Sequence, residues 1–390
     1  MNIVLISPYF PPNWKYFAIG LKRAGANVLA LGDADYDTFD PELSMALTEY
    51  VRVSDLHNYE ELQRACGYFV WKYGSIDRIE SHNEYWLETD AKLRSDFNVY
   101  GVREHQLEAI KNKTGMKQVY INAGLNVARG RLVNNSEEAR AFIAEVGFPV
   151  VAKPDVGVGA AKTYKIESED DMNFFLEDRL QCDYIMEEFI VGDLYSFDGL
   201  TDKDGNIRFW NANYFCRGVM ETVNKDLDIF YHTCRYDLPA GLKEAGERTV
   251  KAFDVRERFF HFEYFVNKKD GRIVCLEVNM RPPGGVTMDM FNYACDVNLY
   301  DEWAKLVCGL PVLPNGFEHK YYASHIGRKI DKNYIHSHEE IMHKCGKFII
   351  AQQPISGVFR GALGDYVYIA RAEQLDQLNE VIAFIQAKYE

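Results

Sequence analysis

The sequence predicts an α/β protein with an N-terminal open parallel sheet, a small sheet-and-helix lid and a mixed-sheet C-terminal lobe. Two observations support this prediction. Apolar strands alternate with amphipathic helices at the start of the chain, whereas β-rich segments dominate after Tyr184. We expect the parts to span residues 1–105, 106–190, 191–310 and 311–390, the last being a β-rich appendage.

The composition limits the class of protein. The 390 residues are 47% hydrophobic, enough for two or three packed cores, and the 8 cysteines form no C-x-x-C pair. The net charge of −14 argues against nucleic acid as a partner, because its backbone requires a basic face. No run of about 18 apolar residues occurs, and the N-terminus is typical of a mature first strand. We therefore expect a cytoplasmic protein without a membrane partner.

The N-terminal part is expected to form a parallel sheet. Its strands are predicted at 2–7, 27–33, 50–55 and 76–81, with helices at 14–25 and 58–74. A strand–helix–strand order favours parallel pairing. The turn after the first strand, "SPYFPPNW", has no G-x-G-x-x-G, so a dinucleotide-binding fingerprint is absent.

The lid is predicted to begin with a helix from about Arg103 to Ala123. A second helix starts at Ser136, which is followed by Glu138, and ends at Gly147. The apolar strand "FPVVAK" then leads into the loop "PDVGVGAAK".

The C-terminal lobe is predicted to consist mainly of strands. One helix is expected between residues 241 and 254, and a single helix from about Thr287 to Cys308 closes the lobe. The strands are expected at 184–190, 194–202, 206–216, 259–266 and 272–279.

The last two of these strands form a hairpin that opposes two acids. "NKKDG" supplies the turn, and the register then places Glu263 opposite Glu277, with Cβ atoms roughly 5 Å apart. Alternation puts both acids on one face together with His261, Cys275, Asn279 and Arg281. Like charges in this position repel one another, and a bound cation would relieve the repulsion.

The ligand types in this hairpin indicate a hard cation. Two carboxylates and the amide of Asn279 suit magnesium, which typically adds substrate phosphates to one or two carboxylates. Arg281 could hold the oxygens of a transferring phosphoryl group. The alternative is a solvent-facing edge strand with ordinary alternating polar residues.

A phosphate-binding loop is the second candidate. Lys153 ends an apolar strand, and Gly157 and Gly159 in the following loop would let backbone N–H groups approach phosphate oxygens. The loop lacks P-loop spacing, so a plain hairpin turn is the alternative. Lys113 alone would be a solvated helix lysine. "YIMEEFIVGD" could present backbone groups to a purine edge, or be an ordinary strand end.

In this order, Lys113, Lys153 with its small-residue loop, "MEEFIVGDLYSFDG", Glu263 and "EVNMRPPGG" resemble the ATP-grasp family. The similar branch includes carbamoyl-phosphate synthase and biotin carboxylase domains and L-amino acid ligases, and the resemblance covers about residues 1–310. It implies the ATP-grasp fold. It further implies roles for the matching positions: ATP phosphate binding by Lys113, Lys153, Gly157 and Gly159; adenine binding by Glu187, Glu188 and Ile190; metal binding by Glu263, Glu277 and Asn279; and acyl-phosphate stabilisation by Arg281.

One position departs from the family pattern. The family often has G-x-E after the adenine hinge, where the acid holds the ribose, but Leu194 stands here. Asp193 is the substitute that we expect. The loop is also less glycine-rich than in biotin carboxylases, which disfavours a carboxylase.

The resemblance implies an ATP- and Mg2+-dependent ligase, with Mn2+ as an alternative metal, that joins a small carboxylic acid to an amine, such as two amino acids. The carboxylate is activated as an acyl phosphate, and "RPPGG" resembles the stretch that meets the substrate carboxylate. The first alternative is a bicarbonate-activating carboxylase or a carbamoyl-phosphate synthase-like enzyme. The second is a non-catalytic ATP-binding regulatory protein. Residues 311–390 are expected to serve either the substrate side or a homodimer interface.

Overall fold

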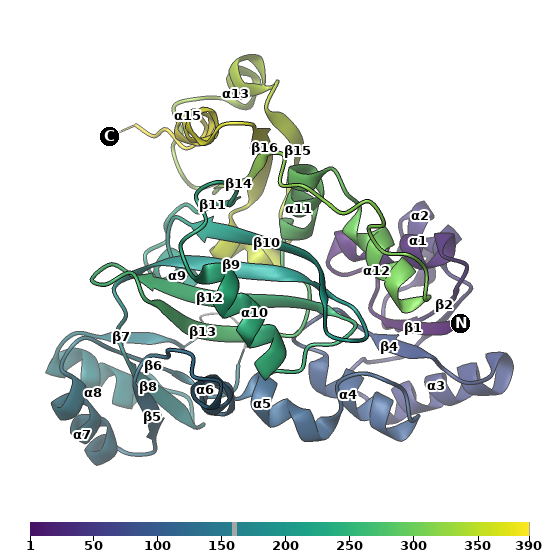
Figure 1. Ribbon diagram of the computed structural model, residues 1–390, viewed down its shortest axis with the longest axis horizontal. Coiled ribbons are helices and arrows are strands. Elements are labelled where there is room, and N and C mark those ends of the chain that lie inside the picture. Colours follow the sequence, from purple (N-terminus) through teal and green to yellow (C-terminus); the bar gives the residue numbers. More distant parts are fainter. Residues whose placement is uncertain (158–161, 390) are drawn as a thin grey trace.

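The computed structural model describes residues 1–157 and 162–389. These residues form three sheets: a four-stranded N-terminal sheet, an eight-stranded central sheet and a second four-stranded sheet (Figure 1). Strand pairs are parallel in the N-terminal sheet and antiparallel in the central one, so the predicted α/β class is confirmed.

The N-terminal sheet has the strand order β3-β2-β1-β4 and is parallel throughout, as predicted. In helix α3, Leu62, Cys66 and Phe69 recur at helical spacing and are buried, which explains why this segment packs as a helix on the sheet. The elements are β1 (Asn2–Ile6), η1 (Pro12–Trp14), α1 (Lys15–Arg23), β2 (Asn27–Gly32), η2 (Tyr36–Thr38), α2 (Pro41–Ala46), β3 (Glu49–Arg52), α3 (Tyr59–Tyr73), β4 (Arg78–Glu80) and α4 (Leu87–Asp96).

The lid segment starts with a broken helix. The single helix expected from Arg103 to Ala123 is instead η3 (Glu104–Gln106), α5 (Leu107–Lys111) and α6 (Lys113–Asn122), because Asn112 adopts an extended conformation. The break makes Lys113 the first residue of α6. Its physical cause is a set of hydrogen bonds to Asp155, described below.

The lid sheet is antiparallel with the order β5-β8-β6-β7. Helix α7 begins after Asn135, whose side chain accepts a hydrogen bond from Glu138 N, so the cap lies one residue before the predicted Ser136. The elements are β5 (Gly130–Val133), α7 (Ser136–Val146), β6 (Val150–Pro154), β7 (Tyr164–Ile166), α8 (Glu169–Asp178) and β8 (Tyr184–Glu188).

The central sheet has the order β13-β12-β9-β10-β11-β14-β16-β15. Its strand pairs are antiparallel, and an isolated parallel bridge joins Val127 to Cys275 at its β13 edge. Residues after 310 contribute β14, β16 and β15, which are the last three strands in this order. The strands are β9 (Gly192–Thr201), β10 (Ile207–Phe215), β11 (Phe230–Thr233), β12 (Phe259–Asn267), β13 (Ile273–Asn279), β14 (Tyr322–Arg328), β15 (Ile349–Pro354) and β16 (Tyr366–Ala372).

Helices cover the central sheet (Figure 1). The single closing helix expected from Thr287 to Cys308 is two helices, because Asp296 takes a left-handed conformation that ends the first. In addition, the predicted helix between 241 and 254 is found as α10. The helices are α9 (Val219–Asn224), α10 (Leu242–Ala252), α11 (Thr287–Cys295), α12 (Leu299–Val307), α13 (His338–Cys345), η4 (Gly357–Phe359), α14 (Arg360–Leu363) and α15 (Leu375–Ile385).

Two large cores hold these units together. One lies beneath α10, where Leu242 and Ala245 pack with Phe197 and Phe260 of the central sheet. The other joins the N-terminal sheet to the central sheet, with residues from Ile3 to Ile369 in one cluster. In the part of the chain that the structure describes, no helix combines the length and apolarity that a membrane crossing requires.

Candidate active site

The structure pairs Glu263 with Glu277 across β12 and β13, which confirms the predicted register. His261 pairs with Asn279, two positions farther from the turn than Glu263 and Glu277. The two glutamate side chains retain 20% and 27% of their exposure, so both carboxylates reach solvent at the sheet end. Two acids therefore face one another at an accessible but largely desolvated position.

A bulge corrects one detail of this hairpin. Beyond Glu263 the register shifts, so that Tyr264 pairs with Cys275 and Leu276 is the extra residue. Cys275 was predicted to share the face of the acids, and this is wrong: it lies in the core with Tyr264. A strict period of two cannot anticipate a shifted residue.

The charges of the two acids are not equivalent. Burial raises the pKa of Glu277, and the charge of Glu263 acts in the same direction against the attraction of Lys113. For Glu263, burial is outweighed by the hydrogen bond from His261, so its pKa is lowered. The pair thus carries unrelieved repulsion that falls mainly on Glu277.

His261 links Glu263 to a buried acid. Its Nδ1 lies 2.5 Å from Asp198 Oδ1, and its Nε2 lies 3.3 Å from Glu263 Oε1. Burial alone would lower the pKa of His261, but the two flanking carboxylates raise it to about 9. Ser196 and Asn213 donate to the other oxygen of Asp198. The protonated ring therefore orients Glu263.

Lys113 lies beside Glu277 because of the helix break. Its Nζ is 4.0 Å from Glu277 Oε1 and donates to Gly157 O at 3.4 Å. Asp155 fixes the start of α6: its backbone oxygen accepts from Lys113 N at 2.9 Å, and its carboxylate accepts from Thr114 N at 2.8 Å. Burial lowers the pKa of Lys113, although Glu277 opposes this effect.

Lys153 lies in a buried ion-pair cluster. Its Nζ is 2.6 Å from Glu187 Oε2, and Lys117 Nζ is 2.6 Å from Glu187 Oε1. Burial would raise the pKa of Glu187, but the two lysines lower it to about 2. The Glu187 carboxylate is therefore fully used in holding these lysines.

The remaining hinge residues lie next to this cluster. Glu188 N donates to Arg129 O at 2.9 Å, and the Glu188 carboxylate forms an ion pair with Arg129 at 2.7 Å. Ile190 is partly buried just beyond the end of β8. Like that of Glu187, the Glu188 side chain is already paired, and the backbone N–H groups of Glu188 and Phe189 are bonded as well.

One predicted residue, Asp193, does not join the cluster. Asp193 forms an ion pair with Lys268 at 2.8 Å, and its side chain is 41% exposed. Gly159 lies outside the described residues. Gly157, by contrast, is held to Lys113 through the hydrogen bond given above.

Arg281 connects the hairpin to the N-terminal part. Its guanidinium donates to Asn279 Oδ1 at 3.1 Å and to Pro282 O at 2.8 Å, and its Nε lies 3.5 Å from Glu84 Oε2. Burial raises the pKa of Glu84, although Arg281 opposes the shift. That oxygen of Glu84 has no hydrogen-bond partner among the described residues.

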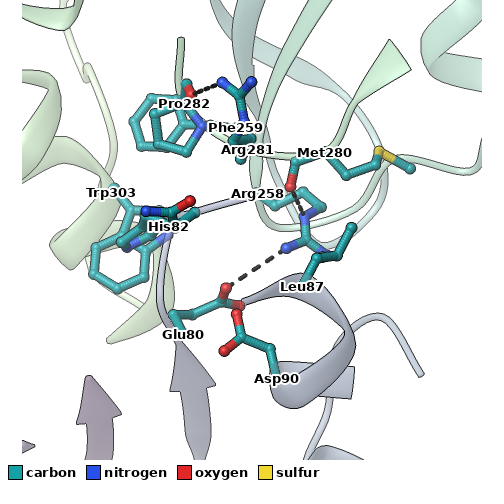
Figure 2. A pocket seen from close by; sticks show the side chains of 11 residues that line it. Glu80, His82, Leu87, Asp90, Arg258, Phe259, Met280, Arg281, Pro282 and Trp303 are labelled. Atoms are coloured by element: carbon teal, nitrogen blue, oxygen red, sulfur yellow. Dashed lines mark hydrogen bonds and ion pairs between the residues drawn. The ribbon is translucent and has the colours of Figure 1, made fainter. Parts of the chain in front are cut away.

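A buried ionic cluster supports this side of the site. Figure 2 shows the Glu80 carboxylate facing the Arg258 guanidinium, with Arg281 lining the same small pocket. Glu80 lies 2.8 Å from Arg94 and 3.5 Å from Arg258, which also donates to Met280 O. The segment before Arg281 is thus fixed to strand β4 by buried charges.

The donor set fits a divalent cation with phosphate oxygens. No group of three or more His, Cys, Asp or Glu side chains in the described residues forms a complete metal centre. Two carboxylates with one amide oxygen are a partial, oxygen-only set that suits magnesium when phosphates complete the shell. Lys113 and Arg281 next to the acids would balance the negative charge of such phosphates.

Sequence reasoning missed several residues of this arrangement. Lys117 follows Lys113 by four positions, a helical spacing that could have indicated a shared face. Asp198 lies two positions after Ser196 on β9, an alternation of polar residues that could also have been noticed. Glu84 and Asp155 leave no pattern in the sequence, because each acts across a long-range contact.

The chain is similar to several characterised proteins, although no protein-family model matches it. It is 25% identical to the L-arginine-specific L-amino acid ligase of Bacillus subtilis over 247 residues, which are 60% of this chain and 58% of that protein. The chain thus spans less than two thirds of that curated relative.

Solved structures show the fold. The L-amino acid ligase from Bacillus licheniformis has a TM-score of 0.74 at 15% identity, and the match covers 98% of this chain and 95% of that one. The biotin carboxylase domain of Hydrogenobacter thermophilus 2-oxoglutarate carboxylase, in complex with MgADP, ADP and bicarbonate, has a TM-score of 0.67 at 15% identity. That match covers 95% of this chain and 86% of the domain.

Proposed function

Since the chain belongs to the ATP-grasp superfamily, we propose that it is an ATP- and magnesium-dependent carboxylate–amine ligase. The observation that carries the proposal is the opposed pair Glu263 and Glu277, with Lys113 and Arg281 beside it. Such an arrangement combines a place for a hard cation with two positive side chains for phosphate oxygens.

The proposed reaction has two steps. A substrate carboxylate oxygen attacks the γ-phosphorus of ATP, the bond to the β,γ-bridging oxygen breaks, and an acyl phosphate and ADP form. The amine nitrogen then attacks the acyl carbon, phosphate leaves with the bonding electron pair, and the nitrogen loses a proton to give the amide. The protein contributes mainly by positioning and by stabilising charge.

In this scheme, Glu263, Glu277 and Asn279 hold magnesium, which when bound neutralises charge on the phosphate oxygens. Lys113 and Lys153 contact the phosphates, together with Gly157 and Gly159 of the loop that follows Lys153 in the sequence. Arg281 stabilises the transferring phosphoryl group. Burial would lower the pKa of Lys153, but Glu187 and, to a smaller extent, Glu277 and Glu263 raise it, so the lysine is charged and within electrostatic reach of the two opposed acids.

The nucleotide base is assigned to the end of β8. We propose that Glu187, Glu188 and Ile190 bind adenine through the backbone groups that the lid sheet leaves unbonded, since both glutamate side chains are already paired and Glu188 N donates to Arg129 O. Asp193 is the proposed ribose ligand, for which its exposed ion pair with Lys268 would have to open.

Amino acids are the proposed substrates. The support is the similarity to an enzyme named as an L-arginine-specific L-amino acid ligase. Glu84 is a candidate for the amine substrate's ammonium group, since it is an acid with one unpartnered oxygen next to Arg281. A cytoplasmic location, where ATP is supplied, and a homodimer are part of the proposal.

The test is ADP release from the purified chain with MgATP and pairs of amino acids and small carboxylic acids. Products are identified by mass spectrometry. Amide formation that depends on both a carboxylate and an amine supports the proposal, and replacing Mg2+ with Mn2+ shows whether that metal also serves. Phosphate release that requires bicarbonate instead would identify the alternative carboxylase or carbamoyl-phosphate chemistry. ATP binding without turnover on any pair would contradict the ligase.

A further inference from the structure

A cavity of about 490 Å³ lies between the N-terminal part, helix α11 and the last strands of the central sheet. Its walls come from the loop after β1, from α1, from η2 and α2, and from β15 and β16. None of the residues assigned above to ATP, metal or substrate lines it. The volume is in the range of small-molecule sites, which typically measure 300–1,000 Å³.

Aromatic rings form much of the wall. Tyr9 stacks with Phe39 at 5.2 Å, and Tyr16 and Tyr293 line the same space. Ring faces of this kind attract cations as well as apolar groups. The wall therefore suits a ligand with both an apolar body and a positive charge.

Asp289 supplies the matching negative charge. Tyr300 donates to Asp289 Oδ1 at 3.0 Å, and Asn13 Nδ2 lies 3.2 Å from Oδ2, so both of its partners are neutral. Within residues 1–157 and 162–389, no lysine, arginine or histidine forms an ion pair with it. Burial raises the pKa of Asp289 to about 6, so the ionised form at neutral pH is held at an energetic cost.

The other charged residues of the wall, Lys15 and Asp40, form an ion pair. Lys15 Nζ lies 2.7 Å from Asp40 and 2.9 Å from Glu42. Lys15 is thus not free to receive a phosphate or a carboxylate. The uncompensated negative charge of Asp289 would repel a nucleotide or another anion, whereas a cation would neutralise it.

A metal ion does not fit this cavity. Asp289 is one carboxylate with its two oxygens already bonded to neutral donors, and Asp40 is committed to Lys15. The space is also far larger than an ion requires. We propose that the cavity is a binding site for a small organic cation, an amine or guanidine with an aromatic or branched apolar body, whose charged group pairs with Asp289.

The site is anchored to the neighbouring turn. Asn13 Nδ2, which contacts Asp289, also donates to Gly285 O at 3.1 Å. Gly285 belongs to the "RPPGG" turn that follows Arg281. The carboxylate that receives the cation is therefore held by the same side chain that fixes this turn, but the proposal itself does not depend on ligase activity.

Binding is tested on the full chain without ATP by isothermal titration calorimetry with 2-phenylethylamine and its neutral analogue 2-phenylethanol. We expect the amine to bind at least tenfold more tightly than the alcohol. Asp289→Asn should weaken the amine at least tenfold and leave the alcohol unchanged. Equal affinities for the two compounds, no amine binding at millimolar concentration, or full affinity in Asp289→Asn would overturn the proposal.

Three further variants separate an effect on the cavity from an effect on folding or on the candidate active site. Gln353→Trp places bulk in the cavity from an exposed position on β15 and should also weaken the amine, whereas Glu373→Trp, exposed and outside the cavity, should not. Glu277→Gln should bind the amine as the wild type does. Loss of binding in Glu277→Gln with retention in Gln353→Trp would place the amine at the candidate active site and refute this one.

Discussion

At the scale of single residues, Glu277 is the less compensated of the two opposed acids. Its pKa is raised, and Glu263 faces it directly across the hairpin. We predict that Glu277→Ala reduces ADP formation at least a hundredfold. The melting temperature of the ligand-free protein should stay the same or rise, because a repelling acid is removed.

The control for that variant is Glu247→Ala, which removes an exposed helix acid paired only with Lys243 at 3.7 Å. Turnover in the control should equal that of the wild type. Wild-type turnover in Glu277→Ala would remove the metal assignment altogether. A strong loss of stability in the same variant would show instead that the acid supports the fold.

His82 gives the protein a pH dependence of stability. Its ring lies 3.9 Å from Phe17 and 4.4 Å from Trp303, and burial lowers its pKa to about 3. Between about pH 6.5 and 3, the unfolded chain binds a proton at His82 that the folded protein does not bind. The contribution of His82 to the free energy of unfolding is therefore fully present above pH 6.5 and is lost as the pH falls toward 3.

We expect the stability of the wild type relative to His82→Gln to fall by about 1.4 kcal/mol per pH unit below 6.5. Urea denaturation at several pH values measures this difference directly. A constant difference from pH 7 to pH 4.5 would show that the ring takes up its proton without unfolding.

At the scale of elements, the start of α6 depends on Asp155. The Asp155 carboxylate accepts hydrogen bonds from Thr114 N and Thr114 Oγ1. It therefore caps α6 from outside the helix, from the residue that follows β6. We predict that Asp155→Ala costs about 1–2 kcal/mol of stability and raises the KM for ATP, because Lys113 loses its fixed position.

Ser168→Ala is a matched control, since Ser168 caps α8 with its own side chain at the far side of the lid sheet. It should cost a similar free energy of unfolding while leaving the KM for ATP unchanged. An equal change of KM in both variants would mean that lid stability alone governs ATP binding.

Helix α10 lies close to the central sheet at Gly246. A Cβ at this position would come within 2.1 Å of the Phe197 ring, a contact that only rearrangement could relieve. We predict that Gly246→Ala destabilises the protein by about 1–3 kcal/mol in thermal or urea unfolding. Gly67 in α3 has no atom within 4 Å of the same point, so Gly67→Ala should be neutral or stabilise by about 0.5–1 kcal/mol.

How well the sequence predicts each element depends on how local its causes are. The Glu263–Glu277 pairing was predictable because a short turn and alternating residues determine it. The helix break at Asn112 was not, since it depends on Asp155, 43 positions from Asn112 in the chain. The bulge at Leu276 is likewise invisible to a regular alternation.

At the scale of the whole molecule, the order of strands and helices was sufficient to predict the α/β class and the parallel N-terminal sheet. It could not show that β14, β15 and β16 extend the central sheet, because β11 and β14 are about 90 residues apart when they pair. For the same reason, the proximity of Glu84 to Arg281 and the cavity around Asp289 were not predictable. Each brings together segments whose contact only the complete fold creates.

The shared core that runs from Ile3 to Ile369 has a consequence for synthesis on the ribosome. The first strand is made long before its apolar partners Val367 and Ile369. Until then the nascent chain exposes part of this surface to solvent. The emergence of β16, more than that of any N-terminal element, is therefore the moment at which this core can close and the protein becomes resistant to aggregation.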